Sequence, residues 1–383
     1  MKTIYMDHSA TTPVRAEVVE AMLPFFGEAY GNASSVHGPG RRAHEALEEA
    51  RATVATMIGA APEEIIFTGG GTEADNLAIK GVAAVARKRH IITSAIEHHA
   101  VLNACTALEK QGFEVTRLPV DAHGLVAPQS LADALREDTC LVTIMLANNE
   151  VGTIEPVREL AALASGAGVP FHTDAVQALG KIPVDVDELG VDLLAISAHK
   201  FYGPKGVGAL YVRKGTRIRP VQHGGHHERG RRAGTENVAG IVGMACALEL
   251  ACAEMGEQSE RLRALRDELA AGLMECVPDC RLNGHPERRL PHLVNLSFEN
   301  VEGESLLMSL DAVGVAVSTG SACTSGTLEP SHVLTSMGIP PEKSHGSLRF
   351  SLGRDNTADD VAYVLEKLPP IVERLRQMSP FAS

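Results

Sequence analysis

Short apolar runs alternate with stretches of helical spacing along the middle of the chain. The apolar runs cover residues 64–67, 90–93, 114–118, 140–146, 169–173, 193–197 and 209–212. Between most of them, residues 72–89, 100–111, 130–135 and 157–165 place apolar side chains at the period of a helix. Unbroken apolar runs are typical of strands that are buried on both faces. The alternation therefore predicts an α/β fold, with a mainly parallel seven-stranded sheet sandwiched by helices.

The flanking parts of the chain have a different pattern. Helical spacing occurs at 15–26 and 41–58, and a long helix is predicted from about 236, passing into a second helix at 258–276. Beyond it, residues 294–298 and 314–317 predict strands, and residues 303–313 and 357–378 predict helices. We expect a large domain at 15–256 and a smaller α+β domain made of 1–14 and 257–383.

Polar residues follow five of the predicted strands. They are residues 68–72, 97–98, 148–149, Asp174 and 197–200. In parallel sheets the ligand lies at the carboxyl ends of the strands, so these five positions predict one shared site.

Lys200 is the central candidate residue, because it follows a buried strand and lysine is rarely buried without a partner. A surface lysine in a loop is the ordinary alternative, but Asp174 and the glycine-rich turn at 69–72 weaken it. Pyridoxal phosphate (PLP) needs such a set: a lysine for its aldehyde, an acid for its ring nitrogen and an anion-binding turn. The turn lacks the Lys-Ser/Thr ending of a nucleotide P-loop, although taken alone it also fits a plain helix start.

Composition narrows the class of protein. The chain has 383 residues and a net charge of −13, which argues against a nucleic-acid surface. No stretch reads as a membrane span of roughly 20 apolar residues, and the start of the chain does not read as a secretory signal. The seven cysteines form no Cys-x-x-Cys pair, which favours a reduced, cytoplasmic enzyme. His223, His226 and His227 lie in a polar loop that we interpret as anion-binding rather than metal-binding, because their spacing matches no ligand set.

The chain resembles the cysteine desulfurases of the NifS/IscS group, within the class V aminotransferases of PLP fold type I. The resemblance runs from residue 5 to residue 354 and is carried by motifs at 5–13, 31–37, 68–76, 97–102, 147–154, 172–177, 197–206, 232–237, 318–325 and 347–354. Among them are Ser-Ala-His-Lys-Phe-Tyr-Gly-Pro-Lys-Gly and Ser-Thr-Gly-Ser-Ala-Cys-Thr-Ser. It implies a homodimer that converts L-cysteine to L-alanine.

The resemblance also implies a role for each matching residue. Lys200 would bind PLP covalently and move the Cα proton, and His98 would stack on the ring and serve as an acid–base group. Asp174 would bind the ring nitrogen and Gln177 the phenolic oxygen. The phosphate would be bound by Gly71, Thr72, Ser197, His199 and, from the partner subunit, Thr235. The substrate or the ring would be contacted by Asn149, Arg349 and Asn32.

Cys323 lies in a loop of small residues at about 318–330, which alone would indicate an incidental surface thiol. The resemblance makes it the nucleophile that takes the substrate sulfur as a persulfide, for iron–sulfur cluster assembly or other thiolation. We expect no resident metal, with Cys323 contacting a cluster only transiently. His8, Ser9 and Ala33 depart from the common pattern, and the chain ends at Ser383, which puts docking of a scaffold protein by a longer tail in doubt. A selenocysteine lyase, a class V aminotransferase and a non-catalytic sulfur-transfer scaffold are the alternatives.

Overall fold

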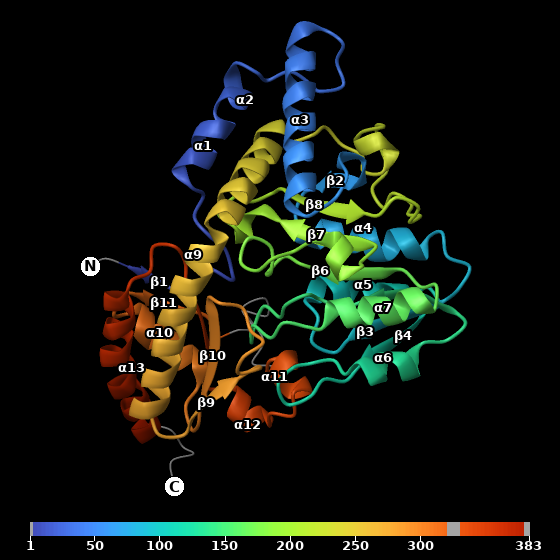
Figure 1. Cartoon of the computed structure of the whole chain (residues 1–383). Coiled ribbons are helices and arrows are strands. Elements are labelled where there is room, and N and C mark those ends of the chain that lie inside the picture. The colour runs from blue at the N-terminus through green and yellow to red at the C-terminus, as the bar shows by residue number, and fades with distance from the viewer. Residues whose placement is uncertain (1–2, 320–329, 379–383) are drawn as a thin grey trace.

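A seven-stranded mixed sheet forms the centre of the larger part of the molecule (Figure 1). The computed structural model describes residues 3–319 and 330–378. The strand order is β2-β8-β7-β6-β5-β3-β4. The bounds are Ile65–Thr68 for β2, His90–Ser94 for β3, Glu114–Leu118 for β4, Thr139–Thr143 for β5, Phe171–Asp174 for β6, Leu193–Ser197 for β7 and Gly208–Val212 for β8. Strands β3 to β7 pair in parallel, and β8 is antiparallel to both β2 and β7. The predicted fold class is confirmed.

Helices cover both faces of this sheet. One face carries α4 (Gly71–Ala83) and α5 (His99–Glu109), whose apolar residues join one core with Ile91 and Leu210. The other face carries α3 (Gly38–Met57), α7 (Val157–Gly166) and part of α9, which share a second core with Phe171 and Ile196. Strands buried on both sides explain the unbroken apolar runs. The remaining helices here are α1 (Ala16–Met22), α2 (Pro24–Gly27), α6 (Pro128–Ala134) and α8 (Val186–Leu189).

A smaller part is built on a three-stranded antiparallel sheet in the order β12-β10-β9. These strands are Ser347–Ser351, Leu293–Phe298 and Cys280–Asn283, and a two-stranded sheet pairs β1 (Ile4–Tyr5) with β11 (Val315–Ala316). Its helices are α10 (Gly303–Asp311), α11 (His332–Ser336), α12 (Pro341–Ser344) and α13 (Ala358–Met378). Met6, Leu296 and Val364 belong to its own apolar core. The division of the chain at residue 256 stays a prediction.

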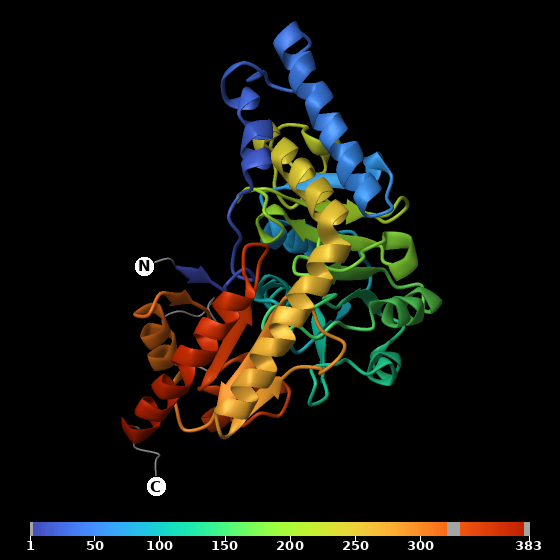
Figure 2. The same cartoon turned by 60° about the vertical axis from the view of Figure 1, so that its left-hand side comes forward.

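Helix α9 connects the two parts as one uninterrupted helix of 39 residues, Val238–Cys276 (Figure 2). The expectation of two successive helices is therefore wrong. The apolar stripe changes near residue 256 because the packing partners change: Leu248 joins the core of the large sheet, whereas Leu269 joins the smaller core. No proline interrupts the segment, so its backbone hydrogen bonds can continue.

Among the described residues, α9 is also the one helix whose length and hydropathy would suit a membrane span. Its most apolar window is 44% buried within the protein, and the helix packs on α1, α3 and α13. Long core helices pass the same test of length and composition, so these contacts explain its apolar character without a bilayer.

Candidate active site

Lys200 ends a short 3-10 helix, Ala198–Lys200, that follows β7 at the carboxyl edge of the sheet. Its Nζ donates hydrogen bonds to the carbonyl oxygens of Ser9 at 2.6 Å and Ala10 at 2.8 Å. The segment before α1 therefore closes over the end of β7. Ser9 contributes through its backbone, for which the sequence carries no signal.

A cleft of about 360 Å³ opens around the Lys200 side chain. Its size is within the usual range for small-molecule sites. The cleft brings together most of the predicted site residues: Gly71, Thr72, His98, Asn149, Asp174, Gln177, Ser197, His199, Lys200 and Arg349. The predicted convergence of separate strand ends is thus what the fold produces.

Asp174 is the last residue of β6 and is buried beneath the cleft. Its carboxylate accepts the N–H of Val176 at 2.9 Å. Burial raises the pKa of Asp174 to about 6, although the Val176 hydrogen bond and Lys200 act in the opposite direction. A buried carboxylate with so little compensation would gain from a cationic N–H in the cleft.

The glycine-rich turn lies between β2 and α4. Gly70 has φ 147° and precedes the first residue of α4, Gly71, so backbone N–H groups at the helix start point outward. Thr68 Oγ1 donates to the Gly70 carbonyl at 3.1 Å, and Glu73 accepts the N–H of Gly69 at 2.7 Å. The turn is therefore held rigidly by its own side chains.

An open pocket of about 660 Å³ continues from the cleft over this turn. It shares Gly71, Thr72, Ser197 and His199 with the cleft and adds Lys205. Lys205 comes from the same motif as Lys200 but was not among the predicted phosphate contacts. A cation beside helix-start N–H groups makes this pocket suited to an anion.

His98 caps the start of α5, with its Nδ1 accepting the Ala100 N–H at 3.1 Å. Burial, followed by the charge of Lys200, lowers the pKa of His98 to about 4. The ring is consequently neutral near pH 7 and held in one orientation above the cleft.

Gln177 and Arg349 each carry a buried polar atom without a partner among the described residues. Gln177 Nε2 donates to the Ser9 carbonyl at 2.9 Å, which leaves Oε1 unpaired. Arg349, on β12, donates to the Asn149 carbonyl at 2.9 Å and to Asp7 at 2.8 Å, and its Nε is unpaired. Buried polar groups are normally satisfied, so these two atoms point to a polar ligand in the cleft.

Two predicted residues that the structure describes do not line the cleft of this chain, and a third lies outside the described residues. Asn32 is exposed between α2 and α3, where its side chain accepts the Ser34 N–H at 2.9 Å. Thr235 is exposed in the loop before α9. Cys323 lies outside the described residues.

The loop that carries Thr235 is attached firmly to the neighbourhood of the glycine-rich turn. Arg51 binds Glu228 through two hydrogen bonds of 2.8 Å, and Glu228 also accepts the Phe67 N–H. Further along the loop, Arg232 pairs with Glu73 at 2.7 Å. Two ion pairs therefore fix this loop relative to β2 and the start of α4.

Comparison with known proteins agrees with this fold and cleft. Residues 4–364 match the aminotransferase class-V family. The chain is 58% identical over 382 residues to a cysteine desulfurase IscS of Dictyoglomus turgidum, covering 99% of this chain and 97% of the relative. Among solved structures, a NifS-like protein superposes with a TM-score of 0.92 at 42% identity, covering 97% of this chain and all of that one. SspA, solved in complex with cysteine, gives a TM-score of 0.82 at 37% identity, over 91% of this chain and 99% of that chain.

The fold and cleft thus define a member of the class V aminotransferases, as the match over residues 4–364 requires. Within that family, the chain belongs to the NifS/IscS group of cysteine desulfurases.

Proposed function

We propose that this chain is a PLP-dependent cysteine desulfurase that converts L-cysteine to L-alanine and passes the sulfur to Cys323. The observation that carries the proposal is the meeting of Lys200, Asp174 and Arg349 in one cleft. These residues supply a covalent anchor for a cofactor, an acid for its ring and a cation for a substrate carboxylate. The group membership of the chain gives the reaction.

The residues of the cleft fit PLP in chemistry and position. Lys200 would bind the cofactor covalently, while the buried Asp174 carboxylate would face a protonated ring nitrogen. Gln177 Nε2 has a second N–H besides the one donated to the Ser9 carbonyl, and Oε1 has no partner among the described residues, so the amide could donate to a phenolic oxygen or accept from a hydroxyl. The phosphate would lie over Gly71, Thr72, Ser197 and His199, beside Lys205. When bound, PLP supplies an electron sink for charge that develops at the substrate Cα.

Substrate binding would depend on Arg349. Its unpaired Nε lies at the cleft, and a guanidinium presents donors in the planar arrangement that a carboxylate accepts. Asn149, whose carbonyl already accepts from Arg349, would line the same side of the substrate. This would orient the Cα–H bond of the substrate toward Lys200, which would move the proton.

The substrate sulfur would then be transferred to Cys323. The Cys323 thiolate would attack the substrate sulfur, the substrate C–S bond would break, and a Cys323 persulfide and alanine would result. Three other cysteines are poor competitors because burial raises the pKa of Cys140 to about 11 and those of Cys105 and Cys280 to about 12. A thiol with such a pKa is almost never ionised at neutral pH.

The wider setting is part of the same proposal. We infer a cytoplasmic homodimer in which Thr235 reaches the phosphate of the partner's site. An iron–sulfur scaffold or another sulfur acceptor would remove the persulfide. Asn32 would assist the substrate carboxylate after the loop before α3 moves toward the cleft.

One assay tests the proposal. The purified protein, loaded with PLP, is given L-cysteine and a thiol reductant, and alanine and sulfide are measured together. Equal amounts of both are expected, and transfer of the amino group to a keto acid without sulfide would overturn the proposal. L-selenocysteine in a parallel reaction decides whether the enzyme is instead selective for selenium.

A further inference from the structure

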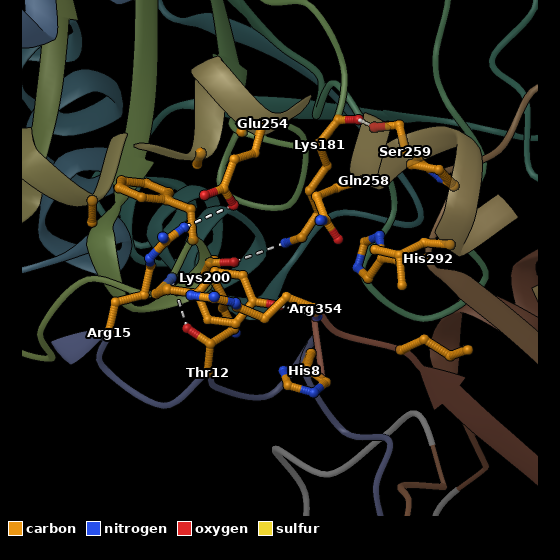
Figure 3. A pocket seen from close by; sticks show the side chains of 18 residues that line it. His8, Thr12, Arg15, Lys181, Lys200, Glu254, Gln258, Ser259, His292 and Arg354 are labelled. Atoms are coloured by element: carbon orange, nitrogen blue, oxygen red, sulfur yellow. Dashed lines mark hydrogen bonds and ion pairs between the residues drawn. The ribbon is translucent and has the colours of Figure 1, made fainter. Parts of the chain in front are cut away.

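A second cavity lies behind Lys200, between the large sheet, α9 and the smaller part of the molecule (Figure 3). Its volume is about 50 Å³, and Lys181, His8 and His292 line it together with the ion pair of Arg15 and Glu254. Lys200 lines both this cavity and the cleft, so the backbone around Lys200 forms the wall between them. None of the proposed catalytic steps uses the residues on the far side of that wall.

Lys181 is the unusual residue of this cavity. Its Nζ donates to the carbonyl oxygen of Lys200 at 2.9 Å, as Figure 3 shows. The residue is only partly buried by surface area, because its side chain borders the cavity, yet protein atoms surround the ammonium. Desolvation, followed by the charge of Lys200, accordingly lowers the pKa of Lys181 to about 7.

No carboxylate of the described residues pairs with Lys181. Glu254, the acid that lines the cavity, is bound to Arg15 at 2.8 Å. The other charges near the cavity are the cations Lys200 and Arg354. An enclosed ammonium without a counterion is strongly unfavourable, so the site must either lose the proton or take up a negative charge.

His8 and His292 add neutral N–H groups that can donate hydrogen bonds to an anion in this cavity. His292 is fully buried, and the Nδ1 atoms of His8 and His292 have no hydrogen-bond partner among the described residues. His292 Nε2 lies 3.4 Å from Ser9 Oγ, and if Nε2 accepts that hydroxyl proton, Nδ1 carries a hydrogen. Burial lowers the pKa values of both rings, which keeps them neutral near pH 7.

We infer that this cavity binds one compact monovalent anion of about the size of chloride. Lys181 is its principal donor, and the neutral rings of His8 and His292 are its polar walls. The cavity has room for about three or four water-sized groups, which is enough for a halide and too little for a phosphate ester. A single charge matches the Lys181 ammonium, for which the described residues provide no carboxylate partner. The bound ion would keep Lys181 protonated and so strengthen the hydrogen bond that Nζ donates to the Lys200 carbonyl.

The inference is independent of the reaction catalysed, and it can be tested on the PLP-loaded enzyme. The melting temperature is followed while sodium chloride replaces sodium gluconate at constant ionic strength, for the wild type, Lys181→Met and Lys110→Met. Lys110 is an exposed lysine on the far end of α5 and provides the matched control. Chloride is expected to raise the melting temperature of the wild type and of Lys110→Met by about 1–3 °C, and to leave Lys181→Met unchanged. An equal rise in Lys181→Met overturns the inference.

A second measurement does not depend on a variant. Crystals of the wild-type enzyme grown with bromide are expected to show an anomalous scattering peak beside Lys181 Nζ, and chloride should displace it. A cavity that contains only water in such crystals, with no halide effect on wild-type melting, overturns the inference even where Lys181→Met fails to fold.

Discussion

Arg349 and Asp7 form an ion pair of 2.8 Å that joins β12 to the segment following β1, at the edge of the active-site cleft. The Arg349 side chain is only 4% exposed, and the Asn149 carbonyl accepts another of its N–H groups. The guanidinium is therefore held from two sides before any substrate arrives, and its Nε has no partner within residues 3–319 and 330–378.

Asp7→Asn should weaken substrate binding without disabling the chemistry. Loss of the ion pair lets Arg349 take other orientations, so KM for L-cysteine should rise about tenfold, equivalent to about 1.4 kcal/mol, while kcat changes less than about twofold. Steady-state kinetics of alanine formation measure both constants. Asp355→Asn, which alters a longer and more exposed contact with Arg354 of 3.7 Å, is the control and should change neither.

Lys200 rather than Lys181 should carry the cofactor. Only Lys200 lines the cleft with Asp174 and Gln177, although the two lysines are hydrogen-bonded neighbours. Borohydride reduction followed by peptide mass spectrometry should place PLP on Lys200 in the wild type and in Lys181→Met. Lys200→Ala should lose this label and at least about a thousandfold in turnover. Labelling of Lys181 in the wild-type enzyme would contradict the assignment.

Cys323→Ala should bind PLP normally but form no persulfide. After a short exposure to L-cysteine without reductant, alkylation and mass spectrometry should find the extra sulfur on Cys323 of the wild type. Cys276→Ala removes an exposed cysteine and serves as the control; it should retain full turnover. Undiminished sulfide release by Cys323→Ala would rule out the proposed sulfur transfer.

Glu97 should make the cofactor-free protein less stable as the pH rises. This carboxyl group is fully buried, and burial raises its pKa to about 8 from 4.5. Because the folded pKa is the higher one, the contribution to stability is complete below about pH 4.5 and is lost as the pH rises through about 8. Measured relative to that of Glu97→Gln, the melting temperature of the wild type should therefore fall between about pH 5 and pH 9.

Glu97→Gln should lose only the part of the pH dependence that comes from Glu97, since Glu155, whose pKa burial also raises to about 8, and His98, whose pKa burial lowers to about 4, remain in the variant. Glu109→Gln is the control. Hydrogen bonding to Arg117 lowers the pKa of the partly exposed Glu109, so its titration lies below this pH window. Parallel melting curves for the wild type and Glu97→Gln would show that the buried carboxyl does not titrate as described.

Glu228→Gln should destabilise the protein and loosen the loop that carries Thr235. It leaves Arg51 without its buried charged partner, with only the more exposed Glu48 remaining, and breaking a buried pair costs about 3–5 kcal/mol. Denaturant unfolding measures this loss, and the PLP dissociation constant should rise as well because Phe67 precedes the glycine-rich turn. Glu48→Gln removes a more exposed partner of Arg51 and should cost less than about 1 kcal/mol.

The regular parts of this fold could be predicted because they depend on local patterns. Unbroken apolar runs identified the strands of the large sheet, and the polar residues after them, such as Asp174 and Lys200, indicated the cleft. Contacts made by the backbone left no such pattern: the Ser9 carbonyl binds both Lys200 and Gln177, although the Ser9 side chain suggests nothing of the kind. Strand β12 was missed although its Ser-Leu-Arg-Phe-Ser sequence alternates polar and apolar residues, because it is only five residues long and its partner strand is about fifty residues away.

Helix α9 was wrongly predicted to be two successive helices for a related reason. Sequence periodicity reports which side of a helix is covered, and in α9 that side changes where one core ends and the next begins. The cavity beside Lys181 could not be predicted either, since it depends on His8, Lys181 and His292 being brought together from three distant parts of the chain.

The continuity of α9 also limits how the enzyme can move. A helix of 39 residues is about 58 Å long. Bending it sharply requires a proline, a bulge or a group inserted between its turns, and α9 contains no proline. A rigid-body rotation of the smaller part away from the larger part is therefore disfavoured. Substrate entry and sulfur delivery should instead proceed by rearrangement of short segments at the rim of the cleft. Helix α9 meanwhile keeps the distance between the two parts of the molecule constant.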